Sequence, residues 1–322
     1  MDKTLWADRG QLLQLDSSDG AGPVGNVPAS CIGISRLGSA QLSPQVFTVW
    51  VQLRGSSWVE AREGRFRLRC GEWIAFERDS RPQLQTDRHG VCIGISLGAD
   101  ALKAAGRVPD LGLHAGRGGL QKREARILVR LWRAASRRLV TLQPGSDGAA
   151  EIAALRPLLL QLAMIQGDLS PRIARCPGRS GVRKRQVFGR LQRAYMYLEG
   201  NCDRVVRISE LAELTSFSSW YFSKTFHALY GESPQAASAR MRLERAADLL
   251  DNSQMMIGEV AAASGFDNCC SFARAFRARY GVSATGYRNA ARKLAMAPLP
   301  ALSAVAARAD SAKSAGPGRK AA

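Results

Sequence analysis

Large apolar residues recur in the same order twice in the last third of the chain, about fifty residues apart. Each copy holds two phenylalanines four residues apart, Phe222 with Phe226 and Phe272 with Phe276. A short apolar run precedes each pair, and a Gly-x-Ser triplet follows it. Apolar side chains at i and i+4 share one face of an α-helix, and a repeat of this length indicates two copies of one supersecondary unit. The pattern therefore predicts two helix-turn-helix units in tandem.

The outer face of the second helix in each unit is where recognition chemistry is expected. A helix-turn-helix unit anchors one face of this helix in its core and presents the other face to base edges. The outward positions are Trp220, Ser223, Lys224 and His227 in the first unit, and Asn268, Cys269, Cys270 and Arg274 in the second. Arg274 is the best candidate for a bidentate contact to guanine, which gives on the order of 1–3 kcal/mol of discrimination. Polar residues just before both helices can cap their N-termini.

Residues 235–251, between the two units, combine apolar residues at helical spacing with interleaved arginines. This pattern predicts one long helix that joins the units and fixes the distance between them. If both outward faces enter the same side of a duplex, their sites should lie one helical turn apart, roughly 10–10.5 base pairs.

Residues 46–97 show a different pattern, in which short runs rich in Val, Ile, Phe and Trp alternate with Gly, Ser and charged residues. Such runs predict strands, here over residues 46–53, 57–62, 65–70, 72–78 and 91–97. In the third run Phe66, Leu68 and Cys70 alternate with three arginines, so one face of that strand should be buried and the other should lie in water. A pocket in which these arginines bind an acidic ligand is the less simple alternative.

Helical spacing returns in residues 121–140 and 149–166. The first helix carries an apolar stripe opposite an arginine face, which consists of Arg123, Arg126, Arg130, Arg133 and Arg137. A solvated basic face is the simpler interpretation, and docking onto DNA phosphate or an acidic partner is the alternative. The second helix aligns four apolar residues on one seam, Ile152, Leu155, Leu159 and Leu162. That seam predicts either packing inside the chain or a short coiled-coil contact with a second copy.

Together these patterns predict an α+β protein of two domains. Residues 1–166 would form the first domain, and residues 167–182, rich in Gly and Pro, would form a linker. Residues 183–293 would form an all-α domain of two helix-turn-helix subdomains joined by the long helix. Residues 294–322, which are poor in large apolar side chains, would form a disordered tail.

Composition adds a polyanionic partner to this picture. The 322 residues carry 46 Lys and Arg against 27 Asp and Glu, a formal net charge of +19 that favours nucleic acid. The excess is spread along the chain, so it supports DNA binding without locating the site. Seven cysteines without a C-x-x-C pair indicate reduced thiols. The lack of a signal-peptide pattern or a membrane-length apolar run predicts a cytoplasmic protein with no membrane contact.

Catalytic functions are disfavoured by the histidine inventory. Gly94–Gly98 matches the G-x-S-x-G nucleophile motif, but the histidines that follow are His114 and His227, and the latter lies on a predicted outward face. Residues 1–166 hold His89 and His114 alone, too few for the iron or zinc site of a cupin-type metalloenzyme. We therefore expect no enzyme activity, no catalytic residue, no metal and no cofactor.

Two further alternatives concern DNA binding itself. A nucleoid-type protein without sequence preference would need only the positive charge, but it leaves the duplicated unit unexplained. Adjacent Cys269 and Cys270 would make binding sensitive to oxidation if a helix N-terminus and Arg274 activated either thiol. A structural role for this cysteine pair is the favoured interpretation.

The two units resemble the DNA-binding domain of the AraC/XylS family of bacterial transcription regulators. The motifs that carry the resemblance are L-A…S…F-x-x-x-F, then I-x-x-V-A…G-F…F-x-x-x-F…G-x-S…Y-R, with R-L-E-R-A at 242–246, and they extend over about residues 183–292. Three positions depart from the family pattern: Ser216 stands for a usual turn glycine, Ala237 for a common aromatic residue and Ala284 for a usual proline. Ser216 would be strained if the turn needs a positive φ.

The resemblance implies a sequence-specific regulator of transcription, which we expect to be an activator, with double-stranded DNA and RNA polymerase as partners. It implies that the outward residues of the two units read different halves of the operator. It also implies an N-terminal cupin-like β-barrel with flanking helices, which binds an effector and dimerises. A small-molecule effector of unknown identity and a second copy of the chain are therefore further expected partners.

Overall fold

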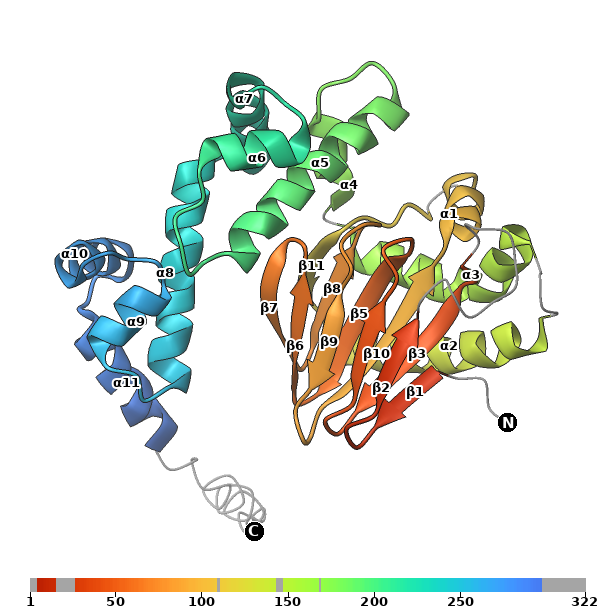
Figure 1. Ribbon diagram of the computed structural model, residues 1–322, viewed down its shortest axis with the longest axis horizontal. Coiled ribbons are helices and arrows are strands. Elements are labelled where there is room, and N and C mark those ends of the chain that lie inside the picture. Colours follow the sequence, from red (N-terminus) through yellow and green to blue (C-terminus); the bar gives the residue numbers. More distant parts are fainter. Residues whose placement is uncertain (1–4, 16–26, 109–110, 143–146, 168, 297–322) are drawn as a thin grey trace, which may run out of the picture. The chain divides into compact units, whose positions relative to one another are not determined.

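The computed structural model describes residues 5–15, 27–108, 111–142, 147–167 and 169–296, and the fold is α+β (Figure 1). The chain divides into two compact units, Met1–Met241 and Arg242–Ala322. The helices are α1 (Ala99–Gly106), α2 (Lys122–Thr141), α3 (Gly148–Ile165), α4 (Leu169–Arg175), α5 (Gly181–Gly200), α6 (Ile208–Thr215), α7 (Ser219–Tyr230), α8 (Pro234–Asn252), α9 (Ile257–Ala263), α10 (Cys269–Tyr280) and α11 (Ala284–Met296). The division falls inside α8, the long helix that the sequence predicts.

Two β-sheets form the N-terminal part of the first unit. One sheet has the strand order β1-β3-β10-β5-β8-β11, and the other has the order β2-β4-β9-β6-β7. The strands are β1 (Leu5–Asp8), β2 (Leu12–Leu15), β3 (Ser30–Ser35), β4 (Ser39–Leu42), β5 (Phe47–Arg54), β6 (Ser56–Ala61), β7 (Gly64–Arg69), β8 (Glu72–Phe76), β9 (Gln83–Thr86), β10 (Val91–Leu97) and β11 (Gly116–Gly119). Trp50, Phe66 and Phe76 fill the core between the sheets.

The expected β-barrel is present only as this pair of sheets. Among the described strands no ladder joins one sheet to the other, so the sheets do not close into a barrel. Each sheet keeps its own edge strands, β1 and β11 in the first and β2 and β7 in the second. A packed apolar core between two sheets therefore replaces the closed wall of a barrel.

The five predicted strands correspond to β5, β6, β7, β8 and β10. In β7 the alternation is confirmed for Phe66 and Leu68, which are buried, but it is wrong for Cys70, which is exposed. The reason is that β7 ends at Arg69 and the chain then turns through Gly71, whose φ is +81°. The thiol of Cys70 therefore lies in the turn and not under the sheet.

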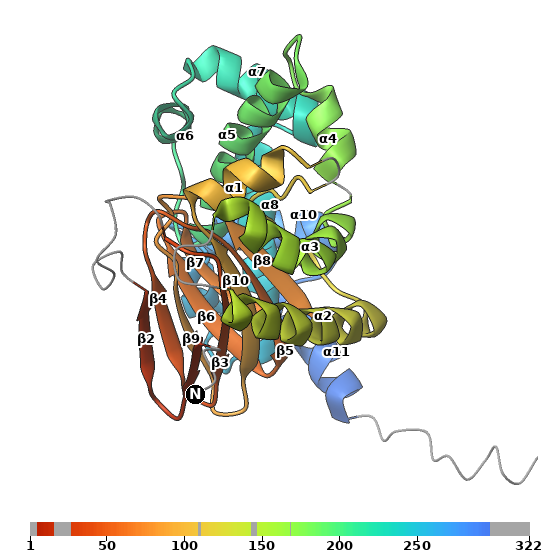
Figure 2. The ribbon, with the colours of Figure 1, turned by 90° about the vertical axis from the view of Figure 1, so that its right-hand side faces the viewer.

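Helices α2 and α3 cover the outer face of the six-stranded sheet (Figure 2). The Trp132 Nε1–H of α2 donates to the Gly94 carbonyl of β10 at 2.8 Å. All four seam residues of α3 are buried in the core that these helices share with the sheet. The seam thus packs inside the chain, which leaves it unavailable for a coiled coil with a second copy.

Helix α3 is also long and apolar enough to cross a membrane by length and composition alone, with a mean hydropathy of 1.4 over 18 residues. Its buried seam faces the six-stranded sheet, which is the placement of a core helix. Packing in the core beside the six-stranded sheet therefore accounts for the long apolar sequence of α3.

The segment 167–182 contains a short helix, α4, and the first residues of α5. Leu169 and Cys176 of this segment are buried. At the other end of the chain, α11 continues to Met296, and the rest of the predicted tail, residues 297–322, lies outside the described residues.

Candidate nucleic-acid interface

The first helix-turn-helix unit consists of α6 and α7. Phe222 and Phe226 are fully buried, so they anchor α7 as the sequence predicts. The Ser218 hydroxyl accepts from the Tyr221 N–H at 3.3 Å and caps the helix. The turn between the helices passes through Ser216, whose φ of +52° lies in the left-handed region.

The outward face of α7 presents the four predicted residues to solvent. Trp220 is 70% exposed, Lys224 and His227 are exposed, and Ser223 is half-buried. The Lys224 Nζ lies 4.8 Å from the centroid of the Trp220 ring, a cation–π geometry. The ammonium and the indole therefore form one continuous surface near the start of the helix.

The second unit consists of α9 and α10, and it repeats this scaffold. Phe272 and Phe276 are fully buried, and the Asn268 Oδ1 accepts from the Ser271 N–H at 2.8 Å. Here the turn passes through Gly265 at a φ of +72°. The same turn conformation thus uses glycine in one unit and serine in the other.

All four predicted residues of this second unit are exposed. Asn268 uses its side-chain oxygen as the cap of α10, which leaves the amide N–H groups for a ligand. The Cys269 thiol points toward α9, because a Cβ added at Gly258 would lie 3.6 Å from its Sγ. Cys270 and Arg274 are one turn apart on the helix, so they share an outward face.

Sequence reasoning missed Arg277 on the outward face of α10. It is exposed and stands one turn beyond Arg274. The signal that could have found it is the offset of fifty residues between the second helices of the two units, which aligns Phe222 with Phe272 and His227 with Arg277. The outward face of α10 therefore carries Arg277 in addition to Arg274, and it is more basic than the predicted set of four residues.

An arginine from the preceding helix supports the turn of each unit. In the second unit the Arg242 Nε–H donates to the Ser264 carbonyl at 3.0 Å, and its guanidinium lies 4.3 Å from the Phe266 ring centroid. In the first unit the Arg190 guanidinium donates to the Thr215 carbonyl at 3.4 Å, and it lies 5.4 Å from the Phe217 ring centroid. These arginines stabilise the scaffold, so they are not counted among DNA contacts.

The start of α6 is fixed by an ion pair. The Arg204 guanidinium donates to the Glu210 carboxylate at 2.8 Å, and the Arg207 N–H donates to it at 3.1 Å. The bond from Arg204, followed by the bond from Arg207, lowers the pKa of Glu210 to about 2. Glu210 therefore stays ionised and keeps the helix start capped at neutral pH.

The part of the chain that the structure describes offers few sites for nucleophilic catalysis, metal binding or thiol chemistry. Ser96, the serine of the G-x-S-x-G match, is buried within β10 between Ser30 of β3 and Thr48 of β5. No group of three His, Cys, Asp or Glu side chains in the described ranges could hold a metal ion. All seven cysteines are free thiols, and burial raises the pKa of Cys31 to about 12.

Comparison with known proteins places the similarity on the same region. A helix-turn-helix domain family matches residues 211–290, a range that includes both α7 and α10. The probable transcriptional regulator LumQ of Photobacterium leiognathi is 30% identical over 92 residues, which are 29% of this chain and 37% of that protein. The transcriptional activator AarP of Providencia stuartii is 26% identical over 93 residues, which are 29% of this chain and 69% of AarP.

One solved structure is similar to part of this chain. The crystal structure of a probable AraC family transcriptional regulator from Rhodopseudomonas palustris is 31% identical and covers 32% of this chain and 96% of its own, with a TM-score of 0.30. The chain spans about a third of the length of LumQ, of the MmsAB operon regulatory protein of Pseudomonas aeruginosa and of PocR of Salmonella typhimurium. These relatives are regulators of transcription, and the C-terminal helix-turn-helix domain is of the AraC type.

Proposed function

We propose that this chain, with its AraC-type helix-turn-helix domain, is a sequence-specific regulator that reads two adjacent major-groove sites. The observation that carries the proposal is the pair of helices α7 and α10, which we name the reader helices. They share an N-cap, a buried phenylalanine pair and a C-terminal glycine, but they expose different side chains. Equal scaffolds with unequal outer faces suit two sites of different sequence. A protein that bound DNA through positive charge alone would not need different outer faces on the two helices.

Each reader helix has its own chemistry for base edges. On α7, the Lys224–Trp220 pair combines a donor with a flat apolar ring, and Ser223 and His227 add polar contacts one turn apart. On α10, Arg274 can make a bidentate contact to guanine. There we assign Cys269, Cys270 and the Asn268 amide to the edge of the same site, with Cys270 suited to a thymine methyl group.

Helix α5 supports control of the readers by the N-terminal domain, because it contacts both the β-sheets and α7. On one face Met196 is buried in the core between the sheets. On the other face Tyr195 stacks on Tyr230 of α7 with ring centroids 4.6 Å apart, and the Tyr230 hydroxyl donates to Gln192 at 2.8 Å. A shift of the sheets against α5 would therefore reach the first reader helix directly.

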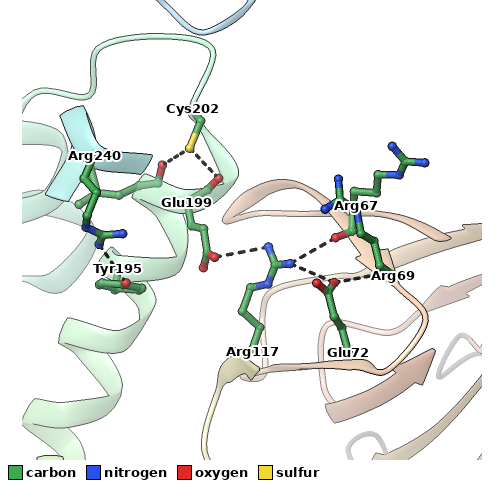
Figure 3. A network of polar contacts seen from close by, with 9 residues as sticks. Arg67, Arg69, Glu72, Arg117, Tyr195, Glu199, Cys202 and Arg240 are labelled. Carbon is green, nitrogen blue, oxygen red and sulfur yellow. Dashed lines mark hydrogen bonds and ion pairs between the residues drawn. The ribbon is translucent and has the colours of Figure 1, made fainter. Parts of the chain in front are cut away.

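Polar contacts hold α5 to the sheets at two places. Figure 3 shows Arg117 of β11 between Glu72 and Glu199, with N–O distances of 3.3 and 3.4 Å. Nearer the start of α5, the Arg193 Nε lies 3.1 Å from the carboxylate of Glu63, which is 2% exposed.

The backbones also come close at this junction. A Cβ at Gly200 would lie 2.5 Å from the Glu63 carbonyl oxygen, so only glycine fits there without a shift. The junction is therefore a close-packed interface between α5 and the sheets, and we assign the transmission of an effector signal to it.

The remaining parts of the proposal follow from these assignments. Residues 1–166 act as a cupin-like regulatory domain that takes a small-molecule effector and dimerises, 167–182 connect it, and 183–293 bind double-stranded DNA. The similarity to AarP, an activator, favours activation through RNA polymerase. A DNA-binding regulator of this kind works in the cytoplasm. A cupin-type metalloenzyme is not favoured, because the described residues offer no cluster of metal ligands.

Genome-wide mapping of the sites bound by the intact chain tests the proposal. The expected result is a bipartite motif whose two halves differ in sequence and lie about 10–10.5 base pairs apart. Sites without a shared motif, spread in proportion to DNA length, would identify a non-specific DNA-binding protein instead.

A further inference from the structure

Five of the six exposed arginines of α2 follow one another in heptad order, and the proposed reader function does not use them. They are Arg123, Arg126, Arg130, Arg133 and Arg137, and we name them the arginine stripe. All five are exposed, and they follow one another at steps of three and four residues. With a rise of about 1.5 Å per residue, the stripe is roughly 21 Å long.

The stripe lacks a neutralising partner. None of its five guanidiniums forms an ion pair with any of the described residues. The acidic residue of α2 is Glu124, and its carboxylate is used to accept from the Gln121 N–H at 2.8 Å. Like charges at i,i+3 and i,i+4 repel along a helix. In the protein without a bound anion, the five guanidiniums therefore destabilise one another.

The chemistry of the face favours phosphate over a protein surface. In the part of the chain that the structure describes, no large apolar side chain of α2 is exposed. Hot spots of protein interfaces are enriched in Trp, Tyr and Arg, and this face offers arginines with no exposed aromatic side chain of α2 beside them. Guanidinium groups instead match phosphate oxygens in bidentate geometry, and a DNA strand offers phosphates at a regular rise of about 3.4 Å. Charge complementarity thus points to the backbone of duplex DNA.

The location of the stripe separates it from the first reader. Helix α2 covers the outer face of the six-stranded sheet, and Figures 1 and 2 both place it at the opposite end of the first unit from α7. The duplex segment on the stripe is therefore not the one in contact with α7.

We propose that the arginine stripe of α2 binds the phosphate backbone of a second duplex segment while the reader helices hold the operator. This inference rests on the proposed function, since it takes operator binding as given. It makes each chain a bridge between a sequence-read site and DNA of any sequence.

A two-duplex capture experiment tests the bridge with the full chain. Operator DNA fixed to beads is loaded with protein and washed, and a labelled duplex without the operator is then added at increasing salt. The wild-type chain should capture the second duplex, with a slope of log affinity against log salt near −4.5 for five neutralised phosphates, at about 0.9 each. The variant with all five stripe arginines changed to glutamine should keep operator binding and lose more than tenfold of the capture.

Matched controls separate the possible outcomes. Changing Arg65, Arg67 and Arg69 on β7 to glutamine removes exposed charge elsewhere and should leave capture within twofold. Equal capture by the stripe variant and the wild type would contradict the proposal. So would stripe-dependent binding of polyglutamate in preference to duplex at equal charge, which would identify an acidic protein as the partner. A wild-type chain without sequence preference would instead contradict the proposed function, because beads that carry a scrambled duplex would then load as much protein as the operator beads.

Discussion

Ser216 concentrates local backbone strain in the first reader unit. Its φ of +52° lies in the left-handed region, which costs an L-residue roughly 1–2 kcal/mol. The equivalent turn of the second unit uses Gly265 at +72°. The departure from the glycine pattern, visible in the sequence, is therefore a real conformational cost, and the buried Phe222 and Phe226 hold the turn in place despite it.

Relief of this strain is measurable. Ser216→Gly should raise the free energy of unfolding by about 0.5–1 kcal/mol, because glycine adopts the left-handed turn without a Cβ clash. Urea titration of the full chain measures the effect, and Gly265→Ala, the matched change in the second unit, should lower the stability. A loss of stability in the glycine variant would show that the Ser216 side chain contributes more than its backbone costs.

His114 gives the fold a specific pH dependence. Burial, with a smaller effect from Arg185, lowers the pKa of His114 to about 4, and its ring meets Phe188 of α5 edge-on at 5.5 Å. The unfolded chain binds this proton near pH 6.5, so stability should be lost as the pH falls from about 6.5 to 4 and should be unaffected above that range.

The variant His114→Leu isolates this contribution. The loss of unfolding free energy between pH 7 and pH 4.5 should be smaller in the variant than in the wild type, by roughly 1–3 kcal/mol. Identical pH dependence in wild type and His114→Leu would exclude burial of the imidazole.

At the scale of elements, the sequence predicts best where a local pattern and a tertiary role coincide. Helices α7 and α10 were predictable because an i,i+4 phenylalanine pair is both a helix signal and a core anchor. Helix α2 and strand β10 were also predictable, because in both a local apolar pattern coincides with burial in the core.

Other elements carry no such signal. Strands β1, β2, β4, β9 and β11 have four residues each, too few for a period to be visible, and ladders to distant strands create them. The turn supports Arg190 and Arg242 likewise depend on contacts between helices. Arg277 was within reach, because alignment of α7 with α10 by fifty residues places it opposite His227.

The first turns of α8 and α11 offer a second comparison between the units. Ser233 and Ser283 cap these helices in the same way, accepting from backbone N–H groups at 3.2 and 3.1 Å. The first helical residue is Pro234 in one case and Ala284 in the other. Proline suits this position because its φ is already helical and the N–H is not needed.

Ala284→Pro should therefore stabilise the second unit. The expected gain is about 0.5 kcal/mol, from reduced freedom of the unfolded chain. Thermal unfolding compared with the wild type measures it, and Ala247→Pro, in the interior of α8, is the control that should be strongly destabilising. A lower melting temperature for Ala284→Pro would show that the backbone at this position differs from that at Pro234.

At the scale of the whole molecule, the chain divides into its two compact units within α8. The first helix-turn-helix unit belongs to the same compact unit as the β-sheets, and the second lies in the other unit. Helix α5 is the reason, because Met196, Arg193 and Gly200 fix it to the sheets. Local patterns cannot reveal this, since the partner residues are more than a hundred positions away in the sequence.

The buried pair at this junction should dominate its stability. Arg193→Met leaves the carboxylate of Glu63, 2% exposed, without its cation, which should cost about 3 kcal/mol of unfolding free energy. The double variant with Glu63→Gln should recover part of the loss, because no unpaired charge then remains buried. Chemical denaturation of the single and double variants measures both. Equal stability of Arg193→Met and wild type would show that α5 is held by apolar contacts alone.

The central claim is that α7 and α10 read different halves of one operator. Its most direct test measures the affinity of the wild type, Lys224→Ala and Arg274→Ala for the mapped operator and for operators scrambled in either half. Arg274→Ala should reduce the loss of binding free energy on scrambling one half by about 1–3 kcal/mol and leave the loss for the other half unchanged. Lys224→Ala should reduce the loss for the other half by a similar amount. Equal losses by both variants on every duplex would contradict the claim, because they would show that these residues only position the DNA backbone.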